Sequence, residues 1–183
     1  MAGRAEKGRR SAGRSWVSGT LDNPCPLMMK SCIHTMVLLL AMMVFSCDPQ
    51  MIYDRYEKAE GGNWSWDEKM VFPVEIQDTT GLHDIYMQIR HTVEYPMSNL
   101  YVFIIVEGPG GQQLRDTVNL ILAEPDGRWK GRGQGKFREL QLLYRKQTRF
   151  AGSGIYTFTL EQGMRRSRVP VTDVGIRIEQ ANP

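Results

Sequence analysis

Apolar residues recur at every second position along most of the chain after residue 69, and this period limits the fold more than any other feature. Alternation of this kind indicates strands with one buried face, whereas an amphipathic helix would need a period of about 3.6 residues. No segment offers a long amphipathic helix, so helical crossovers are missing and the strands must pair antiparallel. The sequence therefore predicts an all-β fold, a single antiparallel β-sandwich of immunoglobulin-like or jelly-roll type, over residues 68–183.

About seven strands are expected, six of them from clear apolar patterns. The six stretches are 70–76, 85–90, 100–106, 118–122, 156–160 and 174–178. Pro73 has no amide hydrogen to donate, so the first stretch should form an edge strand. The stretch 100–106 is apolar throughout, as expected of a central strand covered on both faces. Phe137–Tyr144 fits either a helix face or a strand face, and we favour a strand because its neighbours are strands.

Cys47 follows a run of ten apolar residues, Met36–Phe45, and one small residue. A membrane-spanning helix needs about 20 apolar residues, so this run better suits a signal peptide. The pattern is typical of a bacterial lipoprotein signal, which is cleaved before a cysteine that carries lipid. We expect a signal peptide over 1–46, with a true start at Met28 or Met29, and a covalent, palmitate-type lipid anchor on Cys47. The alternative is a short buried helix with an incidental cysteine.

Residues 47–67 should form the lipidated N-terminus and a tether. They carry charges, a glycine pair and no clear period, so we expect them to be extended or mobile. Trp64 and Trp66 interrupt this polarity and could fasten the tether to the domain or to a partner. Exposed indoles can also stack on sugars, so a glycan-binding envelope lipoprotein is the alternative function, with Trp64, Trp66 and Trp129 as contacts. In the competing interpretation, Trp129 closes one end of the core.

Charge is divided along the chain that follows the expected cleavage site. Residues 48–126 carry 5 basic and 14 acidic side chains, whereas residues 128–168 carry 11 basic and 2 acidic ones. The two halves could interleave and neutralise each other, or the basic connections could bind an acidic partner or anionic lipid headgroups. The candidate interaction surface comprises Arg128, Trp129, Lys130, Arg132, Lys136, Arg138, Arg165, Arg166 and Arg168. Because the chain from Cys47 onward has 17 basic and 18 acidic side chains, its charge gives no reason to expect a nucleic-acid partner.

The sequence after Cys47 contains no recognisable catalytic, metal-binding or nucleotide-binding motif. His83 and His91 are eight residues apart, on or beside one strand, and match no metal-ligand spacing. Gly152-Ser153-Gly154 lacks the spacing of a nucleophile elbow. The glycine-rich loop 131–135 lacks the Lys-Ser/Thr of a P-loop. We therefore predict a protein that is not an enzyme, with no catalytic residue, no metal, no nucleotide and no cofactor besides the covalent lipid.

Several longer stretches follow one another through nearly the whole chain from Cys47. They are Cys47-Asp48-Pro49, Tyr95-Pro96-Met97-Ser98-Asn99-Leu100-Tyr101, Ala123-Glu124-Pro125-Asp126-Gly127-Arg128-Trp129, Tyr156-Thr157-Phe158, Glu161-Gln162-Gly163-Met164-Arg165 and Asp173-Val174-Gly175-Ile176-Arg177-Ile178-Glu179. In this order they resemble the GldH family of gliding motility lipoproteins. The resemblance implies a lipid-anchored protein of the cell envelope, at the outer membrane and facing the periplasm. It also implies a non-catalytic interaction subunit that binds other gliding machinery or envelope proteins, although members occur in bacteria not known to glide.

Overall fold

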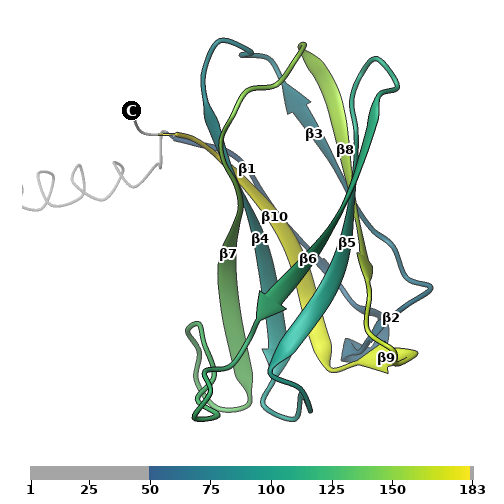
Figure 1. Cartoon of the computed structure of the whole chain (residues 1–183), viewed down its shortest axis with the longest axis vertical. Coiled ribbons are helices and arrows are strands. Elements are labelled where there is room, and N and C mark those ends of the chain that lie inside the picture. The colour runs from purple at the N-terminus through teal and green to yellow at the C-terminus, as the bar shows by residue number, and fades with distance from the viewer. Residues whose placement is uncertain (1–49, 182–183) are drawn as a thin grey trace, which may run out of the picture. The chain divides into compact units, whose positions relative to one another are not determined.

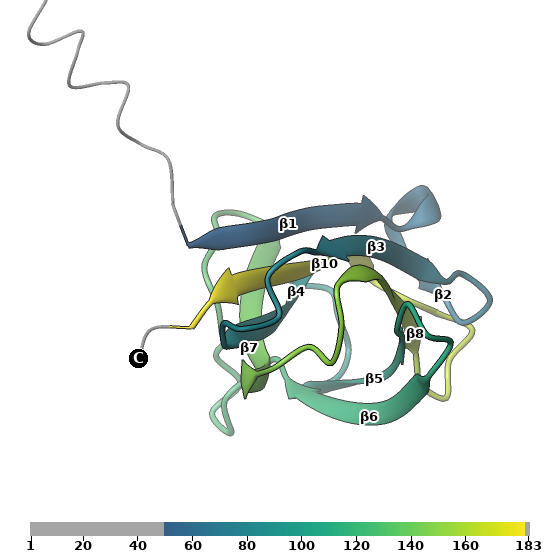
Figure 2. The same cartoon turned by 90° about the horizontal axis from the view of Figure 1, so that it is seen from above.

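Two four-stranded antiparallel sheets face each other in the computed structural model, which describes residues 50–181 (Figure 1, Figure 2). Sheet 1 has the strand order β1-β10-β4-β7, sheet 2 has the order β3-β8-β5-β6, and β2 pairs with β9 in a short ribbon. The predicted all-β sandwich is confirmed. In chain order the elements are β1 (Met51–Lys58), η1 (Glu60–Gly62), β2 (Trp64–Ser65), β3 (Met70–Ile76), β4 (His83–Thr92), β5 (Asn99–Glu107), β6 (Gln113–Ile121), β7 (Phe137–Thr148), β8 (Gly154–Gln162), β9 (Arg168–Val169) and β10 (Val171–Gln180).

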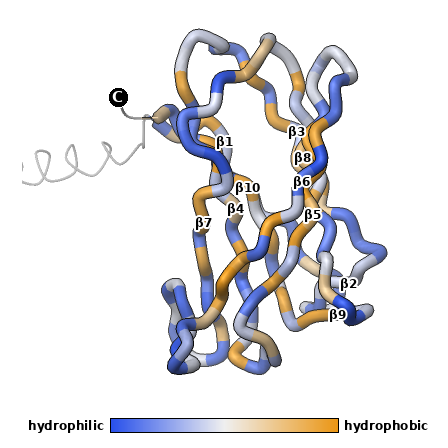
Figure 3. Tube along the Cα trace, in the orientation of Figure 1, coloured by the Kyte–Doolittle hydropathy of each residue, from blue (hydrophilic) through white to orange (hydrophobic). Residues whose placement is uncertain are grey.

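The core forms because both sheets turn apolar side chains inward at alternate positions. In β3, Met70, Phe72 and Val74 are buried while the residues between them are exposed. In β10, Val174 and Ile176 are buried, as the alternation predicted. Figure 3 shows the same alternation of hydrophobic and hydrophilic residues along the strands. A slip of one residue would turn the inward set of a strand toward solvent, so this pattern fixes the register.

Two strand predictions are confirmed. β3 lies at the edge of sheet 2, where Pro73 costs no ladder hydrogen bond on the solvent side. The ambiguous segment that begins at Phe137 forms β7 and pairs with β4. Leu140 is buried, and Leu142 and Tyr144 pack against the core from the same face of the strand. Tertiary packing therefore selected the strand period over the helix period at this segment.

The prediction that 100–106 is covered on both faces is wrong. β5 lies inside sheet 2, but only its inner face is covered, and Tyr101 on the outer face is 42% exposed. No further layer packs on this face among residues 50–181. The Arg115 guanidinium instead lies 5.3 Å from the centroid of the Phe103 ring, a cation–π contact that partly shields the ring. An apolar run therefore indicated a strand correctly but overstated its burial.

Residues 51–58, expected to belong to the tether, form the edge strand β1. The pairing with β10 runs from Met51 opposite Glu179 to Lys58 opposite Asp173. Most side chains of β1 are exposed, and only Tyr53 packs against the core. Ladder hydrogen bonds to β10 hold an edge strand of this kind, so it needs no apolar alternation. The folded body thus begins within a few residues of Cys47, which itself lies outside the described residues together with the expected signal peptide.

The two ends of the sandwich carry different parts of the chain. At one end, which we call the N-terminal end, the amide of Gln180 donates to the carbonyl oxygen of Gln50 over 2.8 Å. β4 starts at this N-terminal end, because His83 pairs with Gln180. At a rise of about 3.4 Å per residue, β4 ends at Thr92 about 30 Å away, at the opposite end of the sandwich. The connections 93–98, 122–136 and 163–167 lie at this opposite end (Figure 1).

Candidate functional site

The two basic connections predicted from the sequence lie at the same end of the sandwich. Backbone hydrogen bonds from two consecutive residues at the end of β4 fix both connections. The amide of Thr92 donates to the carbonyl oxygen of Pro170 (3.1 Å), and the amide of Val93 donates to that of Lys136 (2.8 Å). We call this the basic end. Its basic side chains are Arg128, Lys130, Arg132, Lys136, Arg138, Arg165, Arg166 and Arg168, and Trp129 lies among them.

Only two of these eight cations are paired with carboxylates in the part of the chain that the structure describes. Arg128 Nε lies 2.7 Å from Asp126 Oδ2, and Lys130 Nζ lies 3.3 Å from Glu124 Oε1. Of the other six, all but Arg138 are exposed. The two ion pairs are exposed and stabilise the fold little, and the other six cations have no described carboxylate partner. The basic end can therefore bind an external anion at small cost to stability.

The acidic and basic halves of the chain do interleave, as one alternative predicted. β8 lies between β3 and β5, and β7 lies beside β4. Ion pairs join the halves, such as Lys69 Nζ to Glu161 Oε1 at 2.8 Å and Arg145 Nη2 to Asp116 Oδ2 at 3.3 Å. Neutralisation stays incomplete because the basic connections project beyond the strands that carry these carboxylates. A positive excess therefore remains at the basic end.

A buried aromatic cluster supports the basic end from inside. The ring centroid of His91 lies 4.7 Å from that of Trp129 and 5.6 Å from that of Tyr95. His91 Nδ1 donates to the carbonyl oxygen of Thr92 (2.9 Å), which leaves Nε2 unprotonated in the neutral ring. Burial lowers the pKa of His91, and the positive charge of Arg138 lowers it further, although the bond to Thr92 acts the other way. The half-buried Trp129 thus closes one end of the core.

Gln162 shapes the second basic connection from within, and sequence reasoning missed it. Its Nε2 donates to the carbonyl oxygen of Arg166 (2.8 Å), and its Oε1 accepts from the amide of Met164 (2.9 Å). Gln162 is buried, so these bonds satisfy an amide that would otherwise destabilise the core. The sequence indicates its burial only through the period of two, which places Gln162 on the same inward face of β8 as Phe158 and Leu160.

A hollow of about 480 Å³ lies beside this connection. It is lined by Met97, Tyr101, Gly163, Met164, Arg165 and Arg166. The Met164 sulfur accepts a hydrogen bond from the amide of Tyr101 (3.2 Å), which fixes one wall. Thioether and aromatic surface therefore lies next to two guanidinium groups. Such a surface suits a carboxylate-bearing segment with a neighbouring apolar side chain.

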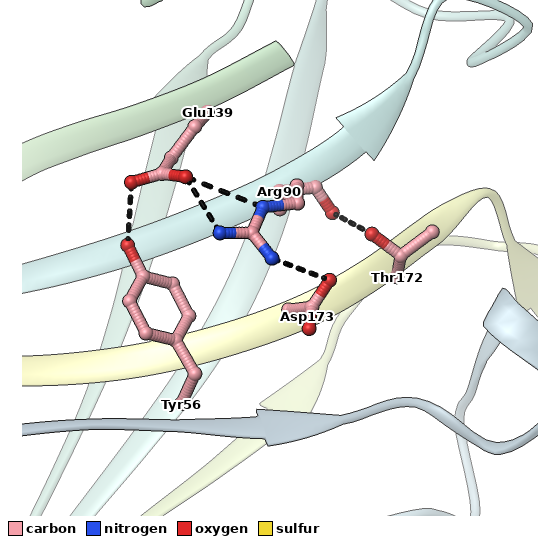
Figure 4. Close-up of polar contacts among 5 residues, drawn as sticks. All are labelled: Tyr56, Arg90, Glu139, Thr172 and Asp173. Atoms are coloured by element: carbon pink, nitrogen blue, oxygen red, sulfur yellow. Dashed lines mark hydrogen bonds and ion pairs between the residues drawn. The ribbon is translucent and has the colours of Figure 1, made fainter. Parts of the chain in front are cut away.

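A second polar cluster, also missed from the sequence, crosses the outer face of sheet 1 (Figure 4). Arg90 in β4 donates through Nε and Nη2 to Glu139 Oε2 in β7, at 3.2 and 2.7 Å. Its Nη1 lies 3.4 Å from Asp173 Oδ2 in β10. Tyr56 in β1 donates to Glu139 Oε1 (3.0 Å), and Thr172 donates to the carbonyl oxygen of Arg90 (3.2 Å). The cluster therefore joins all four strands of sheet 1.

The protonation states of this cluster suit a structural role. Hydrogen bonding from Arg90 lowers the pKa of Glu139, so the carboxylate stays ionised at neutral pH. Burial raises the pKa of Tyr56 far above its usual range, and the hydrogen bond to Glu139 raises it further. Neither group is poised to exchange a proton near pH 7, as a general acid or base would be.

The candidate aromatic contacts differ in exposure. Trp64 is fully buried, and its Nε1 donates to the carbonyl oxygen of Glu68 (2.9 Å). Trp66 is 56% exposed. Trp64 therefore cannot stack on a ligand, and the glycan-binding alternative loses one of its proposed contacts.

Metal-ligating side chains do not gather in the described part of the chain, where no group of three His, Cys, Asp or Glu residues could hold an ion. Residues 50–181 also contain no helix long and apolar enough to cross a membrane.

The sequence matches the family model described as "GldH lipoprotein" over residues 51–178, a range that begins with β1 and ends within β10. The chain belongs to the GldH lipoprotein family. Two relatives agree with this assignment. The gliding motility lipoprotein GldH of Flavobacterium johnsoniae is 33% identical over 152 residues, which cover 79% of this chain and 94% of that protein. The gliding motility lipoprotein GldH homolog of Christiangramia forsetii is 30% identical over 163 residues, which cover 84% of this chain and 99% of that protein.

Solved structures resemble this member of the GldH family only weakly. The mosquito-larvicidal Cry4Aa toxin of Bacillus thuringiensis aligns with 71% of this chain and 21% of its own chain, at 9% identity and a TM-score of 0.38. The infectious bursal disease virus VP2 subviral particle aligns with 73% of this chain and 41% of its own, at a TM-score of 0.21. These similarities are too low to carry an argument about function.

Proposed function

We propose that this protein is a lipid-anchored, non-catalytic interaction subunit of the gliding motility machinery. Its anchor would be a lipid on Cys47 in the outer membrane, with the sandwich facing the periplasm, and its basic end would bind an acidic partner protein. Family membership supports the first part, because the two relatives are named as gliding motility lipoproteins. The observation that carries the second part is that the chain begins its fold at the end opposite the basic connections.

The geometry favours an acidic protein over the headgroups of the anchoring membrane. Three peptide bonds link Cys47 to Gln50 and can span only about 10 Å, so a lipid on Cys47 keeps the N-terminal end near the bilayer. The basic end lies roughly 30 Å farther along β4, well beyond the Debye length of about 8 Å at physiological salt. Its charge is therefore directed toward molecules in the aqueous space, where it would steer and orient an acidic partner.

Recognition would combine charge with apolar contact. Exposed arginines that lack internal carboxylates can form bidentate bonds with Asp or Glu of a partner. The hollow between Met97, Tyr101 and Met164 would accept an apolar side chain next to those carboxylates. We infer that the partner presents an acidic segment with at least one apolar residue.

The anchor is tested by replacing the sulfur that would carry the lipid. Cys47→Ala should release the protein from membranes or block its processing, because two or more acyl chains hold a protein stably and none remain. Membrane fractionation after a high-salt wash, with mass spectrometry of the N-terminus, measures both effects. A variant that still sediments with membranes after the wash would refute the anchor.

The basic end is tested by a pull-down from detergent extract. Arg165→Glu with Arg166→Glu should lower recovery of gliding motility proteins by about tenfold or more, the loss of roughly 1.4 kcal/mol that one charged contact can supply. Arg55→Glu with Lys146→Glu, an equal charge change outside the basic end, is the matched control. Equal recovery by the two double variants would contradict the assignment of the surface, and specific retention on polysaccharide would favour the glycan-binding alternative.

A further inference from the structure

An apolar cavity lies at the N-terminal end, between the β5–β6 hairpin and the segment that follows β7. Its volume is about 260 Å³. Ile85 and Phe158 from the fully buried core form part of its wall, together with Val106, Phe150 and Tyr156. An apolar cavity of about 150 Å³ in another protein stays dry and binds benzene, so this one has room for a longer hydrocarbon.

The mouth of the cavity is left open and partly apolar. Leu114 on β6 contributes to the lining yet is 45% exposed. Exposed apolar surface that continues into a cavity is typical of a ligand-binding site.

Two arginines lie at the same mouth. Arg145 Nη2 lies 3.3 Å from Asp116 Oδ2 and its guanidinium carbon lies 5.2 Å from the ring centroid of Tyr144, yet its side chain is 41% exposed. Arg149 is exposed and makes no ion pair with a described carboxylate. An anionic group at the mouth would pair with Arg149 and with the exposed part of the Arg145 side chain. The chemistry that the site favours is therefore a hydrocarbon chain with an anion at one end.

The position of the cavity identifies the source of such a molecule. The cavity lies at the N-terminal end, three strand spacings or about 15 Å across sheet 1 from the start of β1. Under the proposed anchor on Cys47, this is the end held against the bilayer. The membrane lipids themselves are then the nearest hydrocarbon, whereas the acyl chains on Cys47 carry no anionic headgroup of their own.

We propose that the cavity binds one acyl chain of an anionic membrane lipid, whose headgroup pairs with Arg145 and Arg149 while its other chain stays in the bilayer. This rests on the proposed lipid anchor and extends it. A second attachment to the membrane beside β7, in addition to the one beside β1, fixes the tilt of the sandwich. The basic end is then held pointing away from the membrane.

Photo-crosslinking of the full-length lipidated protein tests the site. The protein is reconstituted in phosphatidylcholine vesicles that contain a small fraction of phosphatidylglycerol with a diazirine near the end of one acyl chain. After irradiation, cross-linked peptides should map to 106–114 and 144–151. The same diazirine chain on phosphatidylcholine should label these peptides about tenfold less, because the anionic headgroup contributes one charged contact. Label confined to the residues next to Cys47, or equal label from both lipids, overturns the proposal.

Variants provide the control. Leu114→Trp places an indole in the mouth and should lower labelling about tenfold by excluding methylene groups from the cavity. Leu143→Trp makes the same exchange at a residue that is 48% exposed and does not line the cavity, and should leave labelling unchanged. Should Leu114→Trp not fold, Arg149→Gln serves in its place and should reduce phosphatidylglycerol labelling to the phosphatidylcholine level. Flotation with the vesicles measures anchoring separately, so a failed anchor and an empty cavity give different results.

Discussion

Arg90 Nη2 lies 2.7 Å from Glu139 Oε2, and this contact joins β4 to β7 across the outer face of sheet 1. The pair does more than connect two neighbours, because Glu139 also accepts from Tyr56 on the edge strand β1. β1 is the first strand after Cys47. The cluster therefore ties the strand nearest the proposed anchor to the far edge of the same sheet.

Glu139→Gln should lower stability at neutral pH and flatten its dependence on acid. Hydrogen bonding from Arg90 lowers the pKa of Glu139 in the folded protein. A lowered folded pKa means that the carboxylate stabilises the fold above the unfolded pKa of about 4.3, and that this contribution is lost as the pH falls through the folded pKa. Both side chains are partly exposed, so we expect a cost of about 1 kcal/mol at pH 7. Urea unfolding between pH 3 and 7 (about the range in which carboxylates titrate) measures the difference.

Glu107→Gln is the control for this prediction, because Glu107 is exposed at the end of β5 and away from the cluster. Its stability should follow the wild type across the same pH range. Identical slopes for Glu139→Gln and the wild type would show that the Arg90 contact adds nothing to the folded state.

Gly175→Ala should destabilise sheet 1, because β10 has no room for a methyl group at this position. A Cβ there would lie 2.8 Å from the carbonyl oxygen of Arg55 and 3.0 Å from Cδ1 of Tyr56. Overpacking of this kind typically costs about 1–3 kcal/mol. Gly152→Ala is the matched control, since its Cβ would meet no atom within 4 Å. Thermal unfolding of the two variants should differ clearly, and equal melting temperatures would contradict the close packing of β1 on β10.

The strands β3, β4, β6, β8 and β10 could be predicted because alternation in their own side chains records which face is buried. β5 is recognisable from an apolar run that does not reveal its exposed face, and β7 fits a helix as well and is assigned from its neighbours. β1 could not be predicted, since its side chains are mostly exposed and its position depends on the free edge of β10. Tyr56 pairs with Gly175, far away in the sequence, and no local pattern reveals such a partner. An edge strand held by backbone hydrogen bonds leaves little trace in composition.

The candidate site was predictable in its residues but not in its arrangement. Clusters of Arg and Lys are visible in the sequence, yet their meeting depends on the strand order β10-β4-β7 that carries Pro170, Thr92 and Lys136 to one end. The Arg90–Glu139 contact has the same origin. The sequence places Trp64 in a tether because the residues around it are polar, but the structure buries it fully in the core.

Trp64→Ala and Trp66→Ala should differ strongly in their effect on stability. Trp64 is fully buried in the core, so its truncation should cost about 3–5 kcal/mol. Trp66 is 56% exposed, and its truncation should change the free energy of unfolding by at most about 0.5 kcal/mol. Trp64→Phe separates the two roles of the indole, because it keeps most of the packing and loses the bond to Glu68, worth about 1 kcal/mol. Denaturant unfolding measures all three, and a mild effect of Trp64→Ala would place this residue outside the core.

Gly131→Ala should displace the glycine-rich connection from β7, whereas Gly127→Ala should not. Both glycines have a φ of +85°, so each substitution pays a left-handed strain of about 1–2 kcal/mol. A Cβ at Gly131 would also clash with the carbonyl oxygen of Glu139, while one at Gly127 would meet nothing within 4 Å. The connection is held there by two backbone hydrogen bonds between Arg132 and Glu139, at 2.8 and 2.7 Å. Amide hydrogen exchange at Arg132 and Glu139 should therefore accelerate in Gly131→Ala alone. Equal exchange in the two variants would mean that this connection does not depend on its close approach to β7.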